Sequence, residues 1–209
     1  TSNFRAGVNA GNSIASGGNY NVAVGDEAGT AITTGDANVA VGYQALSTED
    51  ANGESVAIGY RALKVQNAGA AAYNTAVGYD AGVAVTTATY STIVGGQAGD
   101  AITTGANNTI MGGKAGSGLT TGSNNAAFGY NALNADDVGS KSTAIGAQAL
   151  LTQNYSTATD SHNTAVGYHS GLYLTTGTHN TLIGSEAGDA ITTGTSNNAV
   201  GYGALGATT

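Results

Sequence analysis

A glycine that recurs about every 17 residues constrains this chain more than any other feature of its sequence. It follows two adjacent apolar residues, as in NTAVGYDAG at 74–82, and we number each repeat from this glycine as position zero. Twelve units with a short, nearly fixed period are typical of a solenoid, in which each repeat packs on its neighbours. The position-zero residues are Gly7, Gly25, Gly42, Gly59, Gly78, Gly95, Gly112, Gly129, Gly146, Gly167, Gly184 and Gly201.

Other columns of the repeat are almost as regular as position zero. Position −4 is Asn in nine units and Ser in three, and position +3 is Ala in every unit except one, which has Ser170. The invariant glycine indicates a positive φ or a close approach of backbone, and stacked Asn residues can form hydrogen-bonded ladders. Each unit is too short for two helices and is rich in β-branched residues and turn formers. We therefore predict an all-β fold, a parallel β-solenoid of twelve coils, forming a rod roughly 55 Å long with strands ~4.8 Å apart.

Two columns change together in a way that indicates a narrow core. Seven units have Gly at +4 and an aliphatic residue at +7, as in Gly99 and Ile102. The other five have Leu at +4, as in Leu46, and a polar residue at +7. Close-packed interiors must be filled, so we expect one hole per coil that is filled from either of two backbone positions.

The two residues before position zero are both apolar in almost every unit. Adjacent side chains of a strand point to opposite faces, so Ala76 and Val77 point opposite ways. One faces the core, whereas the other would give the rod an apolar stripe longer than soluble monomers usually expose. Strands that are buried on both faces read as continuous apolar runs. We predict that three rods pack side by side as a homotrimer, so that the partners of each chain are other copies of itself.

The composition argues against several classes of function. The chain has 13 acidic and 5 basic residues and a net charge of −8, whereas nucleic acids and anionic membranes bind surfaces rich in Lys and Arg. Its apolar runs are too short to span a membrane, and without cysteine it has neither disulfides nor cysteine-ligated metals. We expect no nucleic-acid partner, no membrane insertion and no cofactor.

We interpret residues 1–209 as a single β-solenoid domain. The first unit has Phe4 and Arg5 where later units have small or aliphatic residues, which suits a cap coil over 1–20. No cap is evident after Leu205, and an uncapped edge invites pairing. We therefore expect the native chain to continue beyond Thr209.

Units such as NTAVGYDAG (74–82) and NTLIGSEAGDAITTG (180–194) resemble two related groups of repeats. One is the head of trimeric autotransporter adhesins, in which phrases like SVAIG (55–59) build a left-handed parallel β-roll trimer. The other is the NTAVG-type repeat of bacteriophage tail and head fibres, which the period and the ITTG phrase match better. This resemblance implies a non-enzymatic fibre segment on a virion that projects and attaches to a host surface, with surface polysaccharide as its ligand. A bacterial adhesin head at the cell surface is the alternative.

Neither a catalytic group nor a metal site stands out in the sequence. The acidic residues are spread over many columns, as on a solvated face. Asp160, Ser161 and His162 are consecutive, so a triad would need an implausible backbone contortion. His162 and His179 share a column in adjacent coils, about one strand spacing apart. Because three tyrosines occupy the same column, we favour an aromatic ladder over a metal site there.

The two longest inserts are the first places where we expect a ligand contact. They are KVQNAGAAAY (64–73) and LTQNYSTATDSH (151–162), five coils apart. Loops on rigid scaffolds commonly carry recognition, and a bulge without function is the alternative. The candidate contact residues are Lys64, Gln66, Asn67, Tyr73, Gln153, Asn154, Tyr155, Asp160 and His162.

Tyrosine recurs at position +1. Its ring could stack on sugar rings of a polysaccharide, or stacked tyrosines could link neighbouring coils or line a subunit groove, which is the reading we favour. These candidate surface aromatics are Tyr43, Tyr60, Tyr79, Tyr130, Tyr168 and Tyr202.

Paired threonines give a third hypothesis. The pairs at 86–87, 103–104 and 120–121 occupy one place in three successive coils, and flat Thr arrays on β-solenoids resemble ice-binding surfaces. Coils of the Leu type interrupt the array, and Thr is common in strands. An ice-binding β-solenoid is therefore kept as an alternative to a fibre.

Overall fold

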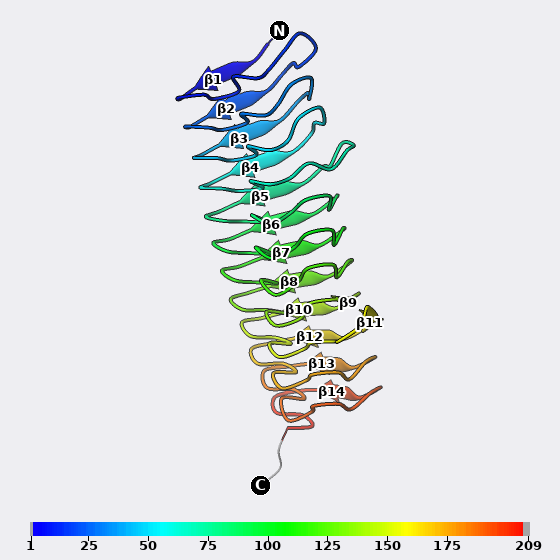
Figure 1. Ribbon diagram of the computed structural model, residues 1–209. Helices are drawn as coiled ribbons and strands as arrows, with labels where there is room; N and C mark the ends of the chain where they lie inside the picture. The colour runs from blue at the N-terminus through cyan, green and yellow to red at the C-terminus, as the bar shows by residue number, and fades with distance from the viewer. Residues whose placement is uncertain (1, 207–209) are drawn as a thin grey trace.

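Parallel strands stack along the whole chain to form one long sheet (Figure 1). The structure is a computed structural model that describes residues 2–206. Neighbouring strands pair in register, so that Thr75, Ala76 and Val77 face Thr92, Ile93 and Val94. The strands of this large sheet are β1 (Phe4–Ala6), β2 (Val22–Val24), β3 (Val39–Val41), β4 (Val56–Ile58), β5 (Thr75–Val77), β6 (Thr92–Val94), β7 (Thr109–Met111), β8 (Ala126–Phe128), β10 (Thr143–Ile145), β12 (Thr164–Val166), β13 (Thr181–Ile183) and β14 (Asn198–Val200).

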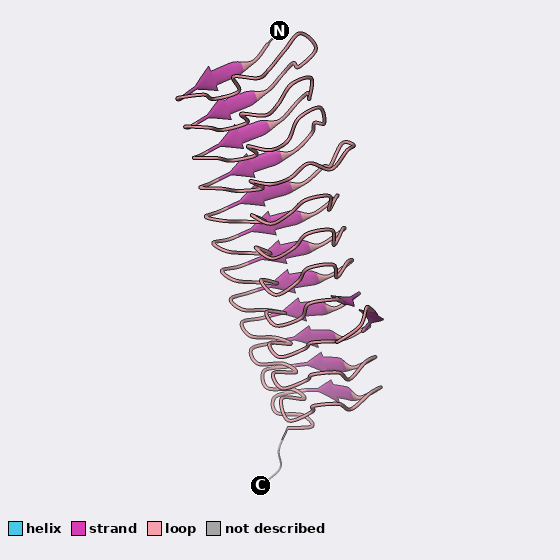
Figure 2. Ribbon diagram, in the orientation of Figure 1, coloured by secondary structure: helices cyan, strands magenta, loops and turns pink. Residues whose placement is uncertain are grey.

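The rest of each coil consists of turns and loops (Figure 2). Two short strands, β9 (Gly139–Ser140) and β11 (Thr159–Asp160), form a second sheet along one side of the rod. Residues 2–206 contain no helix, and so none that could cross a membrane. The predicted all-β parallel solenoid of twelve coils is confirmed. The expected continuation beyond Thr209 lies outside the described residues.

Both reasons for an invariant glycine apply at position zero, where every strand of the large sheet ends. Gly112 has a φ of +137°, a region that side-chain-bearing residues rarely adopt. A Cβ on Gly112 would also lie 2.5 Å from the carbonyl oxygen of Gly129 in the next coil. The coils therefore stack at strand spacing only because this column has no side chain.

The predicted ladder of asparagines runs inside the rod at position −4. The Oδ1 of Asn21 accepts a hydrogen bond from the backbone N–H of Asn38 in the next coil at 2.9 Å. Its Nδ2 donates to the carbonyl of Gly35 across its own coil at 2.7 Å. Most −4 asparagines repeat these two bonds, which satisfy buried polar groups of the narrow coil and tie each coil to the next.

The interior hole is filled from two positions, as predicted. Ile102 and Leu119 at +7, and Leu46 and Leu133 at +4, are all fully buried. Leu46 has a φ of +50°, the left-handed region that glycine occupies at +4 in the other coils. Left-handed backbone costs about 1–2 kcal/mol for such a residue, which burial of the leucine side chain offsets.

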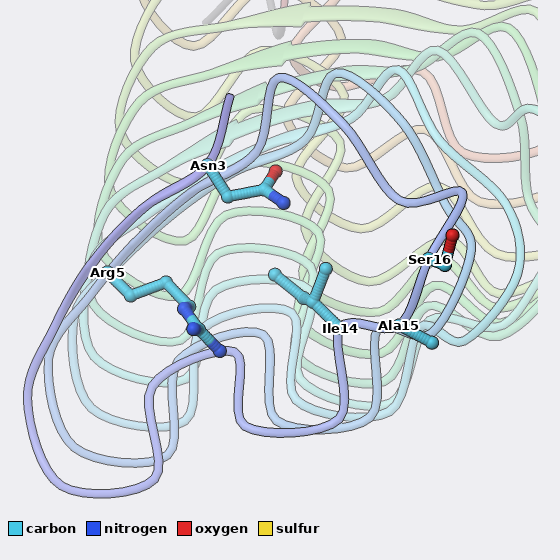
Figure 3. A pocket seen from close by; sticks show the side chains of 5 residues that line it. All are labelled: Asn3, Arg5, Ile14, Ala15 and Ser16. Carbon is cyan, nitrogen blue, oxygen red and sulfur yellow. The ribbon is translucent and has the colours of Figure 1, made fainter. Parts of the chain in front are cut away.

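The first coil differs from the others inside. Arg5 occupies the −2 position, where later coils have an apolar residue, and its Nη1 donates to the Gly11 carbonyl at 3.0 Å. Figure 3 shows Asn3, Arg5 and Ile14 pointing into the coil, around a hollow of about 350 Å³. This polar filling agrees with a cap coil over 1–20, and the cap role remains a prediction.

Candidate functional site

The outward face of the large sheet carries an apolar stripe along the rod. The −2 side chains, such as Ala76 and Ile93, are fully buried inside the coils. The −1 side chains point outward, and Ile58 and Ile183 remain 39% and 40% exposed. The prediction that adjacent apolar residues face opposite ways is confirmed. Because the stripe recurs in every coil from β2 to β14, it is a continuous candidate interface.

A ladder of stacked tyrosines borders this stripe at position +1. The ring centroids of Tyr43 and Tyr60 are 5.3 Å apart, and those of Tyr60 and Tyr79 are 5.2 Å apart. Arg61 lies over the Tyr60 ring, and its guanidinium donates two hydrogen bonds to the Asp80 carboxylate. The interpretation that these tyrosines link neighbouring coils is confirmed for the three. Tyr130, Tyr168 and Tyr202 are exposed, and the adjacent coils carry Gly113, Ala147 or Ser185 in their column.

A second ladder lies at position −5, where the chain enters each strand. Tyr73 stacks on Tyr90 with centroids 5.0 Å apart, and His162 stacks on His179 at 5.1 Å. The expected separation of about one strand spacing is confirmed for the two histidines. Within residues 2–206 no group of three or more potential metal ligands occurs.

The first insert, 64–73, leaves the rod beside the start of β5 (Figure 1). Lys64 is half-buried, and Asn67 and Tyr73 are exposed. Gln66 is fully buried, and its Nε2 donates to Glu49 Oε2 at 2.8 Å and to the Ser55 hydroxyl at 2.9 Å. The expectation that Gln66 contacts a ligand at the surface is therefore wrong, because its amide holds the inside of the coil together.

The second insert, 151–162, repeats this arrangement five coils later. Gln153 is fully buried, and its Nε2 donates to Asp136 Oδ2 at 2.5 Å and to the Ser142 hydroxyl at 2.7 Å. Its Oε1 accepts from Asn163 Nδ2 at 2.9 Å. The proposed surface contact through Gln153 is wrong for the same reason.

Other residues of the second insert divide between the interior and the surface. The Tyr155 hydroxyl donates to the Gly177 carbonyl at 2.7 Å, and burial raises the pKa of this phenol to about 12. Tyr155 is therefore also wrongly assigned to a surface contact. Asn154, Asp160 and His162 are exposed, and Asp160 forms an ion pair with Lys141 at 2.6 Å, where β11 pairs with β9. These exposed residues remain candidates for contact.

Two carboxyl groups are buried at the same position of two coils, which was not predicted. Glu49 and Asp136 occupy position +7 in Leu-type coils, where burial raises the pKa of each and the hydrogen bond from the glutamine of the next coil opposes that rise. The sequence contains a signal for this burial. In both places the coil that supplies the glutamine has Ser, either Ser55 or Ser142, instead of Asn at −4.

In the threonine pairs, the hydroxyl group of the first member donates a hydrogen bond to the next coil. Thr86 Oγ1 donates to the Thr103 carbonyl at 3.1 Å, and Thr103 Oγ1 donates to the Thr120 carbonyl at 3.2 Å. The second members, such as Thr87 and Thr104, are exposed. The first row thus links coils, and this geometry gives the ice-binding alternative no specific support.

Comparison with protein-family models, curated proteins and solved structures finds no match for this chain. Its function is therefore inferred from the repeat and from the geometry of the rod. The apolar stripe, the aromatic ladders and the exposed parts of the two inserts are the surfaces that this geometry provides.

Proposed function

We propose that the chain is a rigid, non-enzymatic segment of an extracellular attachment fibre, in which three copies pack side by side. The apolar stripe on the outward face of the large sheet is the observation that carries this proposal. Val, Ile, Met and Phe occupy the outward −1 column, whereas the inward −2 column is mostly Ala. Large apolar side chains on an accessible face are typical of interfaces between permanently associated subunits.

The coil geometry supports a role in projection and spacing. Each coil hydrogen-bonds to its two neighbours, and every strand of the large sheet pairs in parallel register. Such a stack lengthens by one strand spacing per repeat. The likeness of the NTAVG phrase to phage fibre repeats supports a place on a virion, with a bacterial adhesin head as the alternative. Attachment to host polysaccharide completes the proposal.

Electron microscopy of the purified chain tests this arrangement. We expect straight particles roughly 55 Å long for twelve coils, with three lobes when they are viewed end-on. A charge placed in the stripe by Val94→Lys should convert these particles into thinner, single-lobed rods. Single-lobed particles of the unaltered chain would contradict the proposal.

A further inference from the structure

The tyrosine ladder at +1 is interrupted in the middle of the rod. Tyr79 and Tyr130 occupy this column on either side, and the two coils between them carry Gly96 and Gly113. A groove of about 290 Å³ opens beside this gap, close to the lower size limit of small-ligand sites. Its lining includes Gln97, Asp100, Lys114, Tyr130, Asn131 and Asn134. None of these residues belongs to a strand, so the groove borders the apolar stripe and does not lie on it.

The missing side chains leave one aromatic ring accessible. A Cβ on Gly113 would lie 3.7 Å from Cδ2 of Tyr130, whereas a Cβ on Gly96 would meet no atom within 4 Å. Tyr130 is 57% exposed, and its neighbours in the column are Gly113 and Ala147. The Tyr130 ring therefore borders open space in which a flat ligand can pack.

The polar groups of the groove both donate and accept hydrogen bonds. Gln97 and Asn131 supply carboxamides, and Asp100 and Lys114 supply opposite charges that balance each other. The Oδ1 of Asn131 is buried without a hydrogen-bond partner among the described residues. Asn134 is held in place, because its Nδ2 donates to the Ser117 hydroxyl at 2.6 Å and to the Lys114 carbonyl at 3.0 Å.

These features select one class of ligand. A polar lining disfavours an apolar ligand, and the balanced charges disfavour a strongly charged one. The hydroxyl groups of a sugar donate and accept at once, and the C–H face of a sugar ring packs against an aromatic side chain. We propose that the groove lined by Gln97, Lys114 and Tyr130, beside Gly96 and Gly113, binds a sugar unit of a neutral oligosaccharide or polysaccharide, with Tyr130 packing on the sugar ring. This inference rests on the proposed attachment function, and it places the glycan contact away from the two inserts.

The tyrosine column itself supplies a substitution that covers the Tyr130 ring, because a Cβ on Gly113 would already lie 3.7 Å from it. The double variant Gly96→Tyr/Gly113→Tyr restores the residue that six other coils carry at this position. Neither glycine has a positive φ, so both positions accept a side chain without backbone strain. The matched control is Ser185→Tyr, which adds a tyrosine to the same column three coils beyond Tyr130 and so away from the groove.

Binding to an array of defined neutral oligosaccharides, built from hexoses and N-acetylhexosamines, tests the proposal with the full chain. We expect the unaltered chain to bind at least one of them, Gly96→Tyr/Gly113→Tyr to bind about ten-fold or more weakly, and the control to stay within about two-fold. Circular dichroism and solution mass verify that each variant folds and assembles like the parent. No binding by the unaltered chain, or equal binding by the two variants, would overturn the proposal. If either result occurs with a trimeric mass, the glycan contact in this groove is contradicted and the trimeric rod is not. A monomeric chain that binds sugar would contradict the trimer and not the groove.

Discussion

The two faces of the large sheet differ in the size of their side chains, which are mostly small on the inward face and larger on the outward face. The inward −2 column is Ala in eight of its twelve positions, and all its apolar members are buried. The outward −1 column is Val, Ile, Met or Phe from β2 onward, and its side chains remain partly exposed. In a solitary rod the larger apolar residues would be expected inside. The difference is what the proposed packing of copies side by side would produce, with a narrow coil interior on one face of the strand and a subunit contact on the other.

The largest expected effect comes from breaking the stacking on which both faces depend. Gly112→Ala combines a φ of +137° with a clash against the backbone of Gly129. We expect a loss of at least about 4 kcal/mol in the free energy of unfolding, measured by chemical denaturation. Gly113→Ala, one residue along, lacks both problems and should change this free energy by less than about 0.5 kcal/mol. Equal losses in the two variants would refute the stacking argument.

Adjacent substitutions in β7 separate the two faces directly. Ile110→Ala empties part of the interior and should cost about 2–5 kcal/mol at any protein concentration. Met111→Ala removes a side chain from the outward stripe, so its cost should vary with protein concentration, as expected for linked assembly. Thermal unfolding at several concentrations distinguishes the two. A melting temperature of the unaltered chain that does not change with concentration would contradict a partner on the outward face.

The two ways of filling the interior can be exchanged within one coil. Leu119→Ala leaves a cavity and Gly116→Leu overfills the coil, because a Cβ on Gly116 would already lie 3.1 Å from Leu119 Cδ1. In the double variant, leucine at 116 should occupy the space that position 119 vacates. A double-mutant cycle of unfolding free energies should give a favourable coupling of about 1–3 kcal/mol. Additive losses would mean that the two positions serve different spaces.

A smaller, pH-dependent effect concerns the polar interior of the Leu-type coils. Burial raises the pKa of Glu49 in the folded state. The contribution of this raised pKa to the free energy of unfolding is therefore complete below the ordinary carboxyl pKa, and it is lost as the pH rises through the pKa of the folded state. Glu49→Gln avoids this loss. Relative to the parent, it should gain on the order of 1 kcal/mol in unfolding free energy at pH 7 and least at pH 4.

Asp160 provides a control with the opposite sign. The hydrogen bond from Lys141 lowers the pKa of Asp160, so its contribution is present at neutral pH and is lost as the pH falls. Asp160→Asn should therefore remove stability at neutral pH rather than add it. A gain at pH 7 for both variants would show that net charge, rather than burial of Glu49, is responsible.

The fold was predictable because each coil repeats the same physical constraint. The glycine at position zero and the asparagines at −4 are each visible in a single column, and the exchange between Leu46-type and Ile102-type filling is visible in two columns. The burial of Gln66, Gln153 and Tyr155 was not predicted, because polar residues in inserts read as surface residues. Most of their partners come from neighbouring coils. Only Ser55 and Ser142, in the same coils as the glutamines, signalled the space they needed. The groove at Gly96 and Gly113 likewise emerges only once several coils are stacked.

The solution mass from light scattering tests the central claim, that the outward apolar stripe is covered by further copies of the chain. We predict a mass near three times the chain mass of 20.2 kDa, falling to that of one folded chain in Val94→Lys. A well-folded monomer for the unaltered chain would contradict this account.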